Sequence, residues 1–407
     1  MPETITGIEQ YELQSVSLAS ADQATLKLWE SFCGRHLSTS HHQDPAWLSG
    51  FFARELSNVT AYFLRHSGEL QGVAPFLLKD WPLNWYLGEM ALARPPLRRL
   101  RFLGDTLNLP EEEAVYDILF AELAKSRRSF DAVHFEAIPL DSFLWKYLQS
   151  SPLIRRSFRM YVPEPPASHV ELRFGASFDQ YMKKFSAKSR STLRRKIKRI
   201  RDGVIGPMRL VRYTDPRDVP AFLESAVAVS KKTYQWNLLQ KGMSDTDLVA
   251  QRLAFAAEHG WLRCYMLFCN DVPCAFLSGF QNGGVYSLLD TGFDPDLSKY
   301  SVGMVLQLLA IEDLFAENTP RVYDFGTWGG WKQELSTDSY PEVKVLLFQP
   351  GAYTRMIQTG HRGTQIFTKA VGSLLERMNL KVRLKKLIRG MSEKNAPAQA
   401  TEESEAE

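Results

Sequence analysis

The spacing of apolar residues predicts a mixture of helices and strands in the first part of the chain. Apolar positions three and four residues apart indicate amphipathic helices, whereas positions two residues apart indicate half-buried strands. The segment 81–101 is rich in Trp, Pro and Arg, follows neither spacing and is interpreted as irregular. The predicted elements are helices over 22–32, 45–55, 111–127 and 142–149 and strands over 59–65, 73–78 and 131–136.

The second part of the chain repeats this mixture after a break in regular structure. The cluster Pro163, Glu164, Pro165 and Pro166 cannot continue a helix or a central strand, so it is interpreted as a domain linker. Both parts run in the order helix, helix, hairpin, which favours two similar α/β (α+β) domains. The predicted elements beyond the linker are helices over 178–201, 218–233, 245–259 and 301–318 and strands over 208–213, 262–269, 272–280, 285–290, 322–325 and 343–348.

Length and composition support two hydrophobic cores. The chain has 407 residues, 44% of them hydrophobic, which is more than one core usually contains. Its 49 basic and 46 acidic residues leave a net charge of only +3, but the charges are unevenly distributed. The expected organisation is a domain over 1–165, a domain over 166–350, a basic helical extension over 351–390 and a disordered acidic tail over 391–407.

The compartment is predicted to be cytoplasmic, without a metal and without integral membrane contact. The N-terminus has no basic start followed by an apolar run, and the apolar stretch 302–311 is too short to span a bilayer. Cys264, Cys269 and Cys274 recur every five residues, a wider spacing than zinc pairs use. The cysteines are therefore interpreted as buried thiols, with Cys264 and Cys269 on opposite faces of one strand.

One predicted helix carries an unusual excess of positive charge. Between Lys183 and Arg201 there are ten basic residues in nineteen positions and no acidic residue. Uncompensated repulsion of this size indicates a nearby anion, and phosphate is the plausible one, although a merely solvated face would show the same composition. Lys188, Arg190 and Arg194 are the candidate substrate contacts on this helix.

Two further segments have the composition of binding loops. Over 286–309, a strand ends at Asp290 and an uncharged helix opens near Ser301 and Gly303, which is an arrangement that suits a phosphate at a helix N-terminus. An ordinary Ser-capped helix would look the same. Over 322–334, a strand enters a loop rich in Gly and Trp, which is typical of a site but also of a packed turn.

Other catalytic patterns are absent from the sequence. There is no GxSxG elbow, no HExxH, no P-loop and no GxGxxG after a strand. His41 and His42 precede a predicted helix and are interpreted as a polar cap rather than as metal ligands.

These motifs, in this order, resemble a known family. The segments QDPAWLSGFF, GVAPFLL, FSAKSRSTLRRKIKRI, YSVGMVLQLLAIED and YDFGTWGGWKQE are similar to those of CelD/BcsL-type acetyltransferases, which are two-domain relatives of the GNAT superfamily and of the Fem peptidyltransferases. The resemblance spans about residues 43–348. It implies tandem GNAT-like domains, each a mixed, largely antiparallel sheet flanked by helices, with a degenerate first domain and an acyl-CoA site in the second.

The resemblance also implies roles for individual residues. Asp290 is the candidate general base, although a capping role fits it equally; Tyr323 or Tyr286 would protonate the leaving sulfur, and Lys332 would position the substrate. The turn has one Gly instead of Gly-x-Gly/Ala, and Trp331-Lys332 stands where the family commonly has Tyr-Lys. The implied cofactor contacts are Tyr286, Leu288, Lys299, Ser301, Val302, Gly303 and Met304. The implied substrate contacts are Lys188, Arg190, Arg194, Trp236, Asp324, Trp328 and Trp331.

The predicted function is acyl transfer from acetyl-CoA or another acyl-CoA to an amine or hydroxyl of a small molecule or glycan precursor, as in polysaccharide biosynthesis. A Fem-like enzyme would instead take its acyl group from aminoacyl-tRNA, for which the basic helix is also suited. A non-enzymatic protein that binds anionic surfaces or nucleic acid through this helix and the basic segment Lys381–Arg389 is the third possibility.

Overall fold

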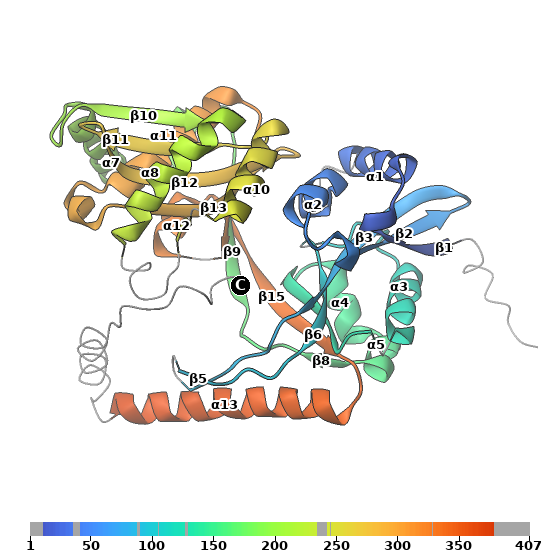
Figure 1. The fold of residues 1–407 in the computed structure, drawn as a ribbon. Helices are drawn as coiled ribbons and strands as arrows, with labels where there is room; N and C mark the ends of the chain where they lie inside the picture. Colours follow the sequence, from blue (N-terminus) through green and yellow to red (C-terminus); the bar gives the residue numbers. More distant parts are fainter. Residues whose placement is uncertain are drawn as a thin grey trace, which may run out of the picture.

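The protein is built around one continuous sheet that both halves of the chain share (Figure 1). In the part of the chain that the structure describes, the sheet has 13 strands in the order β1-β2-β3-β6-β7-β15-β9-β14-β13-β12-β11-β10, with β8 paired to β15. This computed structural model describes residues 11–35, 41–87, 90–104, 106–126, 129–233, 242–244, 246–327 and 329–377.

The N-terminal half ends in two parallel neighbouring strands that a helix connects, an arrangement called a parallel crossing below. Its first four strands pair antiparallel, and β7 then lies parallel to β6, with helix α3 (Glu113–Lys125) between them in the chain. The parallel pairing covers three register positions, Arg99 with Ala132 to Arg101 with His134. The strands are β1 (Tyr11–Ser17), β2 (Val59–His66), β3 (Glu69–Asp80), β6 (Arg98–Phe102) and β7 (Ala132–Pro139).

The C-terminal half has the same plan. Four antiparallel strands are followed by β14, which lies parallel to β13 after helix α11 (Val302–Glu317). The tandem arrangement expected from the sequence is thereby confirmed. The strands are β10 (Met208–Tyr213), β11 (Cys264–Cys269), β12 (Val272–Asn282), β13 (Val285–Phe293) and β14 (Val322–Thr327).

Two strands join the halves. Strand β9 (Ala167–Arg173) pairs with β14, and the long β15 (Asp338–Phe348) pairs with β9 at its start and with β7 at its end. The short β8 (Arg159–Tyr161) lies beside the end of β15, and the Pro163–Pro166 cluster connects β8 to β9. Consequently, residues of β15 such as Val345 and Leu347 belong to the core of the N-terminal half.

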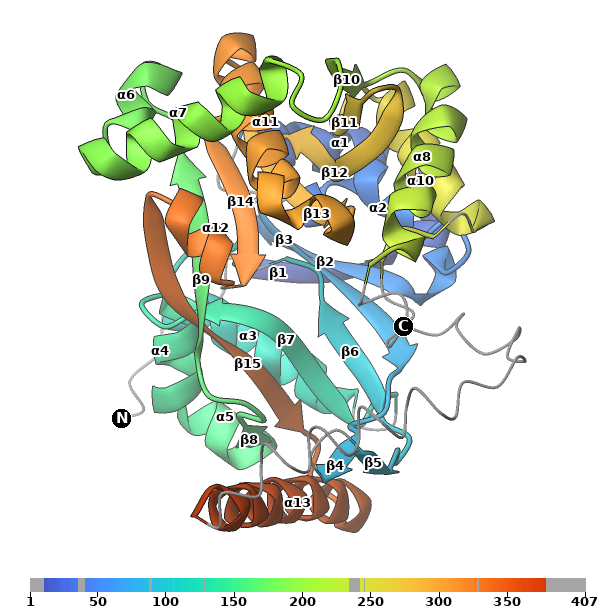
Figure 2. The same cartoon turned by 90° about the vertical axis from the view of Figure 1, so that its left-hand side faces the viewer.

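Helices cover both faces of the sheet (Figure 2). In the C-terminal half, α6, α7 and α11 enclose one core, and α8 and α10 enclose a second core on the opposite face. Trp47 of α2 packs into this second core and so fastens the halves together. The remaining helices are α1 (Gln23–Arg35), α2 (Pro45–Phe51), α4 (Phe143–Ser150), α5 (Pro152–Ser157), α6 (Phe178–Met182), α7 (Ala187–Arg201), α8 (Val219–Lys231), α10 (Asp247–Glu258), α12 (Gly330–Leu335) and α13 (Ala352–Arg377).

The cysteines occupy these cores without forming disulfides. Cys264 lies in the core under α8 and α10, whereas Cys269 and Cys274 lie in the core under α11, so the prediction of opposite faces is confirmed. Cys33 is only partly buried, and for this residue the expectation of a buried thiol is wrong.

Several predicted elements were wrong in extent. The helix predicted over 178–201 is two helices, because the Ser186 side chain accepts the Ser189 N–H at 3.1 Å and starts α7 anew. The segment interpreted as irregular contains β4 (Trp85–Leu87), β5 (Met90–Ala93) and β6. The basic segment Lys381–Arg389 and the predicted tail over 391–407 lie outside the described residues.

Helix α13 is the longest described helix, but it is too polar to be a membrane span. No other helix among the described residues has the length and apolar character that crossing a bilayer requires either.

Candidate functional site

The site is built where β13 and β14 separate. The two strands pair in parallel over only three positions, Val285 to Ser287 with Val322 to Asp324. Beyond them, β13 follows β12 through a bulge at Ser278/Gly279, and β14 follows β9 through a register shift. The facing edges of the diverging strands therefore leave backbone groups that a ligand in extended conformation can pair with.

Buried polar groups hold the diverging strands apart. The Tyr323 hydroxyl donates to Oε1 of Gln307 on α11 at 2.9 Å, and Nε2 of Gln307 donates to the Thr291 hydroxyl at 3.4 Å. Tyr286 and Tyr323 are both fully buried, and the Tyr286 hydroxyl donates to the Arg263 carbonyl at 3.1 Å. Burial raises the pKa of both phenols well above the usual value. The structure thus places these two candidate residues inside the core, where they support the separation of β13 and β14, called the splay below.

The first turn of α11 lies at the open end of the splay. Ser301, the residue before the helix, has a left-handed backbone with φ of 58°, and its side chain makes no capping hydrogen bond. No acidic residue lies in the first turn, so no carboxylate of that turn neutralises the N–H groups of Val302, Gly303 and Met304 or the positive end of the helix dipole. A Cβ at Gly303 would lie 3.0 Å from Cδ1 of Phe293, so the absence of a side chain leaves room for the end of β13.

Cations of α7 lie beside this turn. A cavity of about 100 Å³ is lined by basic residues of α7 and by the residues just before α11. The guanidinium of Arg199 lies 5.8 Å, and Nζ of Lys299 5.1 Å, from the centre of the Tyr300 ring. None of the cavity's cations forms an ion pair within the described residues. The lining residues are Thr192, Arg195, Lys196, Arg199, Ile200, Lys299 and Tyr300.

The α7 residues in this cavity differ from those selected in the sequence. Lys188, Arg190 and Arg194 do not line it, and Arg194 instead lies 3.3 Å from the carboxylate of Asp179. Arg195 and Arg199 are one helical turn apart, so they share a side of α7. This spacing could have shown from the sequence that Arg195 and Arg199 lie on one side of α7. Only the packing of α7 on α11 shows that this side faces the first turn of α11.

Two aspartates project from the face of β13 and β14 that lies opposite α11. Tyr323 and Thr291 point toward α11, so their neighbours Asp324 and Asp290 point away from it. Solvent reaches the Asp290 side chain, yet the protein packed around its carboxyl raises its pKa by desolvation. Between them on this face lies Ser287, whose buried hydroxyl has no hydrogen-bond partner among the residues that the structure describes. Sequence reasoning missed Ser287, which carries no motif signal.

Asp324 belongs to a buried ion cluster. Its Oδ1 lies 2.8 Å from Nε2 of His169, and Nδ1 of the same ring lies 2.9 Å from Oε2 of Glu342. Burial alone would lower the pKa of His169, but the two carboxylates outweigh it and raise the pKa to about 10. For Asp324, burial opposes ionisation, and His169 reverses this and lowers its pKa. Sequence analysis missed His169 and Glu342 because they come from β9 and β15, far apart in the chain.

The loop after β14 is held by its own side chains. Nζ of Lys332 donates to the carbonyls of Phe325 at 2.6 Å and Thr327 at 3.2 Å, and burial lowers its pKa. The Trp331 ring meets the Phe325 ring edge-on at 6.1 Å. These contacts shape the end of the splay. Of the other predicted substrate contacts, Trp236 and Trp328 lie outside the described residues.

The N-terminal half reaches the same face through His42. Solvent reaches the His42 side chain, yet desolvation by the protein around its ring is the main cause that lowers its pKa to about 4. The positive charge of Arg101 lowers the pKa further and the negative charge of Asp324 opposes it, so His42 lies within electrostatic range of both residues. Its interpretation as a cap is wrong, because Asp44 caps α2 by accepting the N–H groups of Ala46 and Trp47. No cluster of His, Cys, Asp and Glu in the described chain is arranged to hold a metal.

Comparisons with known proteins agree with this geometry. Residues 187–334, which run from α7 to α12, match the family model of the acetyltransferase (GNAT) domain. The fold is similar to that of FemX, with a TM-score of 0.57 and 12% identity over 83% of this chain and 97% of that one. No curated protein matches the sequence.

Two further solved structures are similar at lower scores. One is a tandem GNAT protein from the clavulanic acid biosynthesis pathway, with a TM-score of 0.48 and 13% identity over 84% of this chain and 99% of that one. The other is L-PGS from Bacillus licheniformis, with a TM-score of 0.46 and 13% identity over 81% of this chain and 97% of that one.

Proposed function

We propose that the protein transfers an acyl group from acyl-CoA to an amine or hydroxyl acceptor. The observation that carries this proposal is the open splay of β13 and β14, which ends at an uncapped helix N-terminus beside cations that lack carboxylate partners. An acyl-CoA has complementary chemistry, because it joins an extended amide chain to a pyrophosphate. A binding surface of this kind, inside a GNAT domain, is suited to such a donor.

In this proposal the donor lies along β13. Backbone groups of the diverging strand pair with the amides of pantetheine, and the exposed Leu289 and Phe293 contact its apolar carbons. The pyrophosphate lies at the N–H groups of 302–304, where Arg195, Arg199 and Lys299 neutralise its charge. Lys188, Arg190 and Arg194 then serve at most the outer part of the basic face.

The acyl transfer takes place on the face with the aspartates. Asp290 accepts the proton of the attacking amine or hydroxyl, and its raised pKa suits a group that must be both deprotonated and basic near neutral pH. The Ser287 hydroxyl is the donor for the thioester carbonyl, since no described residue accepts its hydrogen bond. As nitrogen or oxygen attacks that carbon, the carbon–sulfur bond breaks and the thiolate leaves. Tyr323 and Tyr286 keep the splay open instead of transferring protons.

The acceptor approaches from the side of the N-terminal half. His42, Asp324 and His169 lie there, and the N-terminal half supplies His42. This arrangement supports the proposal that the first domain shapes the acceptor side and that the acceptor is a small molecule or glycan precursor, as for CelD/BcsL-type enzymes. A cytoplasmic location, where acyl-CoA is found, belongs to the same proposal.

Calorimetric titration with acetyl-CoA and longer acyl-CoAs tests the donor site. Gly303→Glu places a negative charge in the first turn of α11, whereas Gly303→Gln has nearly the same volume without the charge. We expect the Glu variant to bind about 100-fold more weakly than the wild type and the Gln variant about 10-fold. Equal affinities in all three proteins would remove the proposed pyrophosphate site.

A Fem-like transfer from aminoacyl-tRNA is the second candidate function. The basic face of α7 extends beyond the small cavity to exposed cations such as Lys183, Lys188 and Lys198, and a longer phosphate backbone would contact more of it. Saturable tRNA binding with a steep loss of affinity at higher salt, together with no heat signal from acyl-CoA, would establish this function instead.

A further inference from the structure

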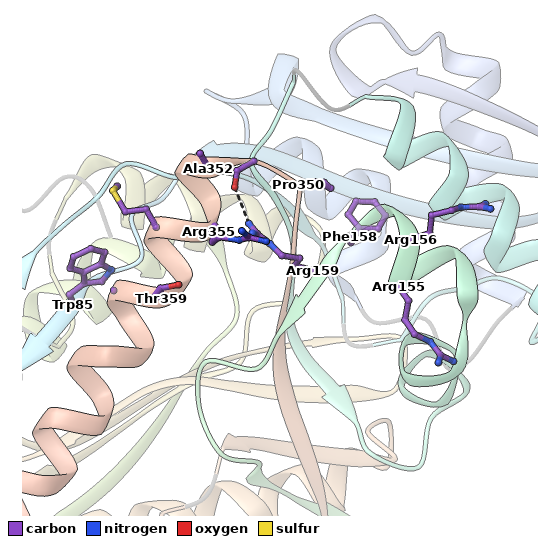
Figure 3. A pocket seen from close by; sticks show the side chains of 12 residues that line it. Trp85, Arg155, Arg156, Phe158, Arg159, Pro350, Ala352, Arg355 and Thr359 are labelled. Carbon is purple, nitrogen blue, oxygen red and sulfur yellow. Dashed lines mark hydrogen bonds between the residues drawn. The ribbon is translucent and has the colours of Figure 1, made fainter.

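A second cavity lies on the N-terminal half, away from the splay. It measures about 930 Å³ and opens between the start of α13, the end of α5 and strand β8 (Figure 3). No residue of the proposed donor site lines it. The lining residues are Trp85, Arg155, Arg156, Phe158, Arg159, Pro350, Gly351, Ala352, Arg355, Met356, Thr359 and Gly360.

Four arginines around this cavity have no acidic partner. Within the described part of the chain, none of Arg155, Arg156, Arg159 and Arg355 forms an ion pair. The guanidinium of Arg159 donates to the Thr354 hydroxyl at 2.7 Å, but its Nε is buried and has no partner among the described residues. The sequence has no Asp or Glu between 142 and 163 or between 343 and 375. The cavity therefore concentrates positive charge that an anion would neutralise.

Large apolar side chains are exposed beside the arginines. Helix α13 buries Ile357 and His361 against the protein, and its outward face shows Met356, Ile366 and Phe367 at 52%, 61% and 56% exposure. The hairpin of β4 and β5 packs on α13, with the Thr368 hydroxyl donating to the Tyr86 carbonyl at 2.9 Å. This hairpin exposes three more apolar side chains, those of Tyr86, Met90 and Leu92. Exposed large apolar side chains on two adjoining elements favour an interaction site.

Charge and apolar character are ordered along α13. Arg355, Arg362 and Lys369 are exposed and recur every seven residues, so they form a row on one side of the helix. The exposed Met356, Ile366 and Phe367 lie next to this row, toward the outer side of the molecule. A helix with an apolar stripe flanked by cations is typical of helices that lie in the interface of an anionic bilayer.

We propose that α13, the β4–β5 hairpin and the arginine cavity form a docking face for the surface of an anionic phospholipid bilayer. The exposed apolar side chains enter the boundary between head groups and acyl chains, and a lipid phosphate occupies the arginine cavity. A second copy of the chain is a poor occupant, because two-fold packing of this face on itself would bring the same cations together. A soluble polyanion would use the arginines but would leave the apolar stripe in water.

Vesicle flotation tests this face. The full chain is expected to float with vesicles of phosphatidylcholine and phosphatidylglycerol and not with vesicles of phosphatidylcholine alone. A triple variant that removes three of the cavity arginines is expected to bind vesicles about fivefold more weakly for each cation removed: Arg155→Gln, Arg156→Gln and Arg355→Gln. Ile366→Ser with Phe367→Ser is expected to weaken it without changing the charge. The matched control removes three exposed cations on α1 and just after α2, which lie far from α13 (Figure 1), and should bind as the wild type does: Lys27→Gln, Arg35→Gln and Arg54→Gln.

Three results would overturn the proposal. The first is failure of the wild type to bind anionic vesicles; the second is undiminished binding by both α13 variants, which would assign binding to another surface. The third is a dimer that the Ile366→Ser, Phe367→Ser variant converts to monomers without any vesicle binding, which would make the face an interface between copies. Acyl-CoA affinity should be equal in all these variants, so the outcome is independent of the proposed donor site.

Discussion

The two parallel crossings of the sheet have the same topology, but they differ in the features that would favour a bound anion. In the N-terminal half, β6 leads through α3 to β7, and in the C-terminal half β13 leads through α11 to β14. Each pair of strands is parallel over three register positions. They differ in what occupies the space after the first strand and in the charge at the start of the helix.

The N-terminal crossing is closed. The Gln43 side chain lies against Gly104 just after β6, and its Nε2 donates to the Thr106 carbonyl at 2.7 Å. The Val73 N–H donates to the Asn108 carbonyl at 3.0 Å, which fastens the following loop to β3. Helix α3 begins at Glu113, directly after Glu112, so two carboxylates lie at its positive end and disfavour an anion there.

The C-terminal crossing has none of these features: α11 starts after Ser301 without an acidic first turn, next to the cations of α7. The two crossings of one chain thus share a topology, while a few side chains differ at the point where the proposed donor site lies. This difference supports the proposal that only the second domain holds a donor. The following predictions test this difference, beginning with the largest expected effect.

Asp290→Asn tests whether the open crossing performs the chemistry. We expect kcat to fall about 100-fold or more, since a general base contributes on this scale, while the affinity for acetyl-CoA stays unchanged. Burial raises the Asp290 pKa, and the deprotonated form is the active one, so wild-type kcat/KM should rise with pH through that pKa. Thiol release from acetyl-CoA with a panel of amines measures both effects. An unchanged pH profile in the variant would leave Asp290 without a catalytic role.

His169→Gln tests the cluster that joins the crossings across β9 and β15. The variant leaves Asp324 and Glu342 without their cation, which is expected to reduce the free energy of unfolding by about 3 kcal/mol at pH 7. Because the folded pKa of His169 is raised to about 10, its stabilising contribution is complete below its unfolded pKa of about 6.5 and is lost as pH rises toward 10. Urea unfolding at pH 7 and pH 10 should therefore show the gap between the two proteins shrinking.

Arg195→Gln with Arg199→Gln tests the cations beside α11. Loss of two charge-assisted hydrogen bonds to phosphate is expected to raise the Kd for acetyl-CoA about 30-fold. Lys198→Gln, on the same helix but outside the cavity, is the matched control and should bind acetyl-CoA normally. Equal losses in both proteins would indicate a diffuse electrostatic effect instead of a site.

Glu112→Gln with Glu113→Gln tests the closed crossing and has the smallest expected effect. Removing the acidic start of α3 should leave one acyl-CoA bound per chain, because the Gln43 side chain still fills the crossing. The change in unfolding free energy should stay within about 0.5 kcal/mol, as for most exposed substitutions. A second binding event in calorimetry would show that charge alone keeps this crossing empty.

Local periodicity was sufficient to predict most helices and strands, because burial on one face imposes a repeat that is visible in a short window. Periodicity failed where strand pairing or a single capping residue decides the structure. Strand β9 pairs on both sides with strands distant in sequence, and β6 carries Arg99 and Arg101 on one face, so neither shows a clear apolar signal. The break before α7 depends on one capping serine, Ser186, among many polar residues.

For the candidate site, the chain alone pointed to the helix start near Ser301 and Gly303, to the strand end at Asp290 and to a basic helix, because charge and glycine content are properties of short segments. The family resemblance added the segment 299–304 and Asp324. Only the tertiary structure decided that Arg195 and Arg199 face the turn, that Tyr323 is a buried support, and that His169 and Glu342 surround Asp324. The physical reason is register: which side chains meet depends on how strands pair and helices pack across the sheet, and these contacts leave no local pattern in the sequence.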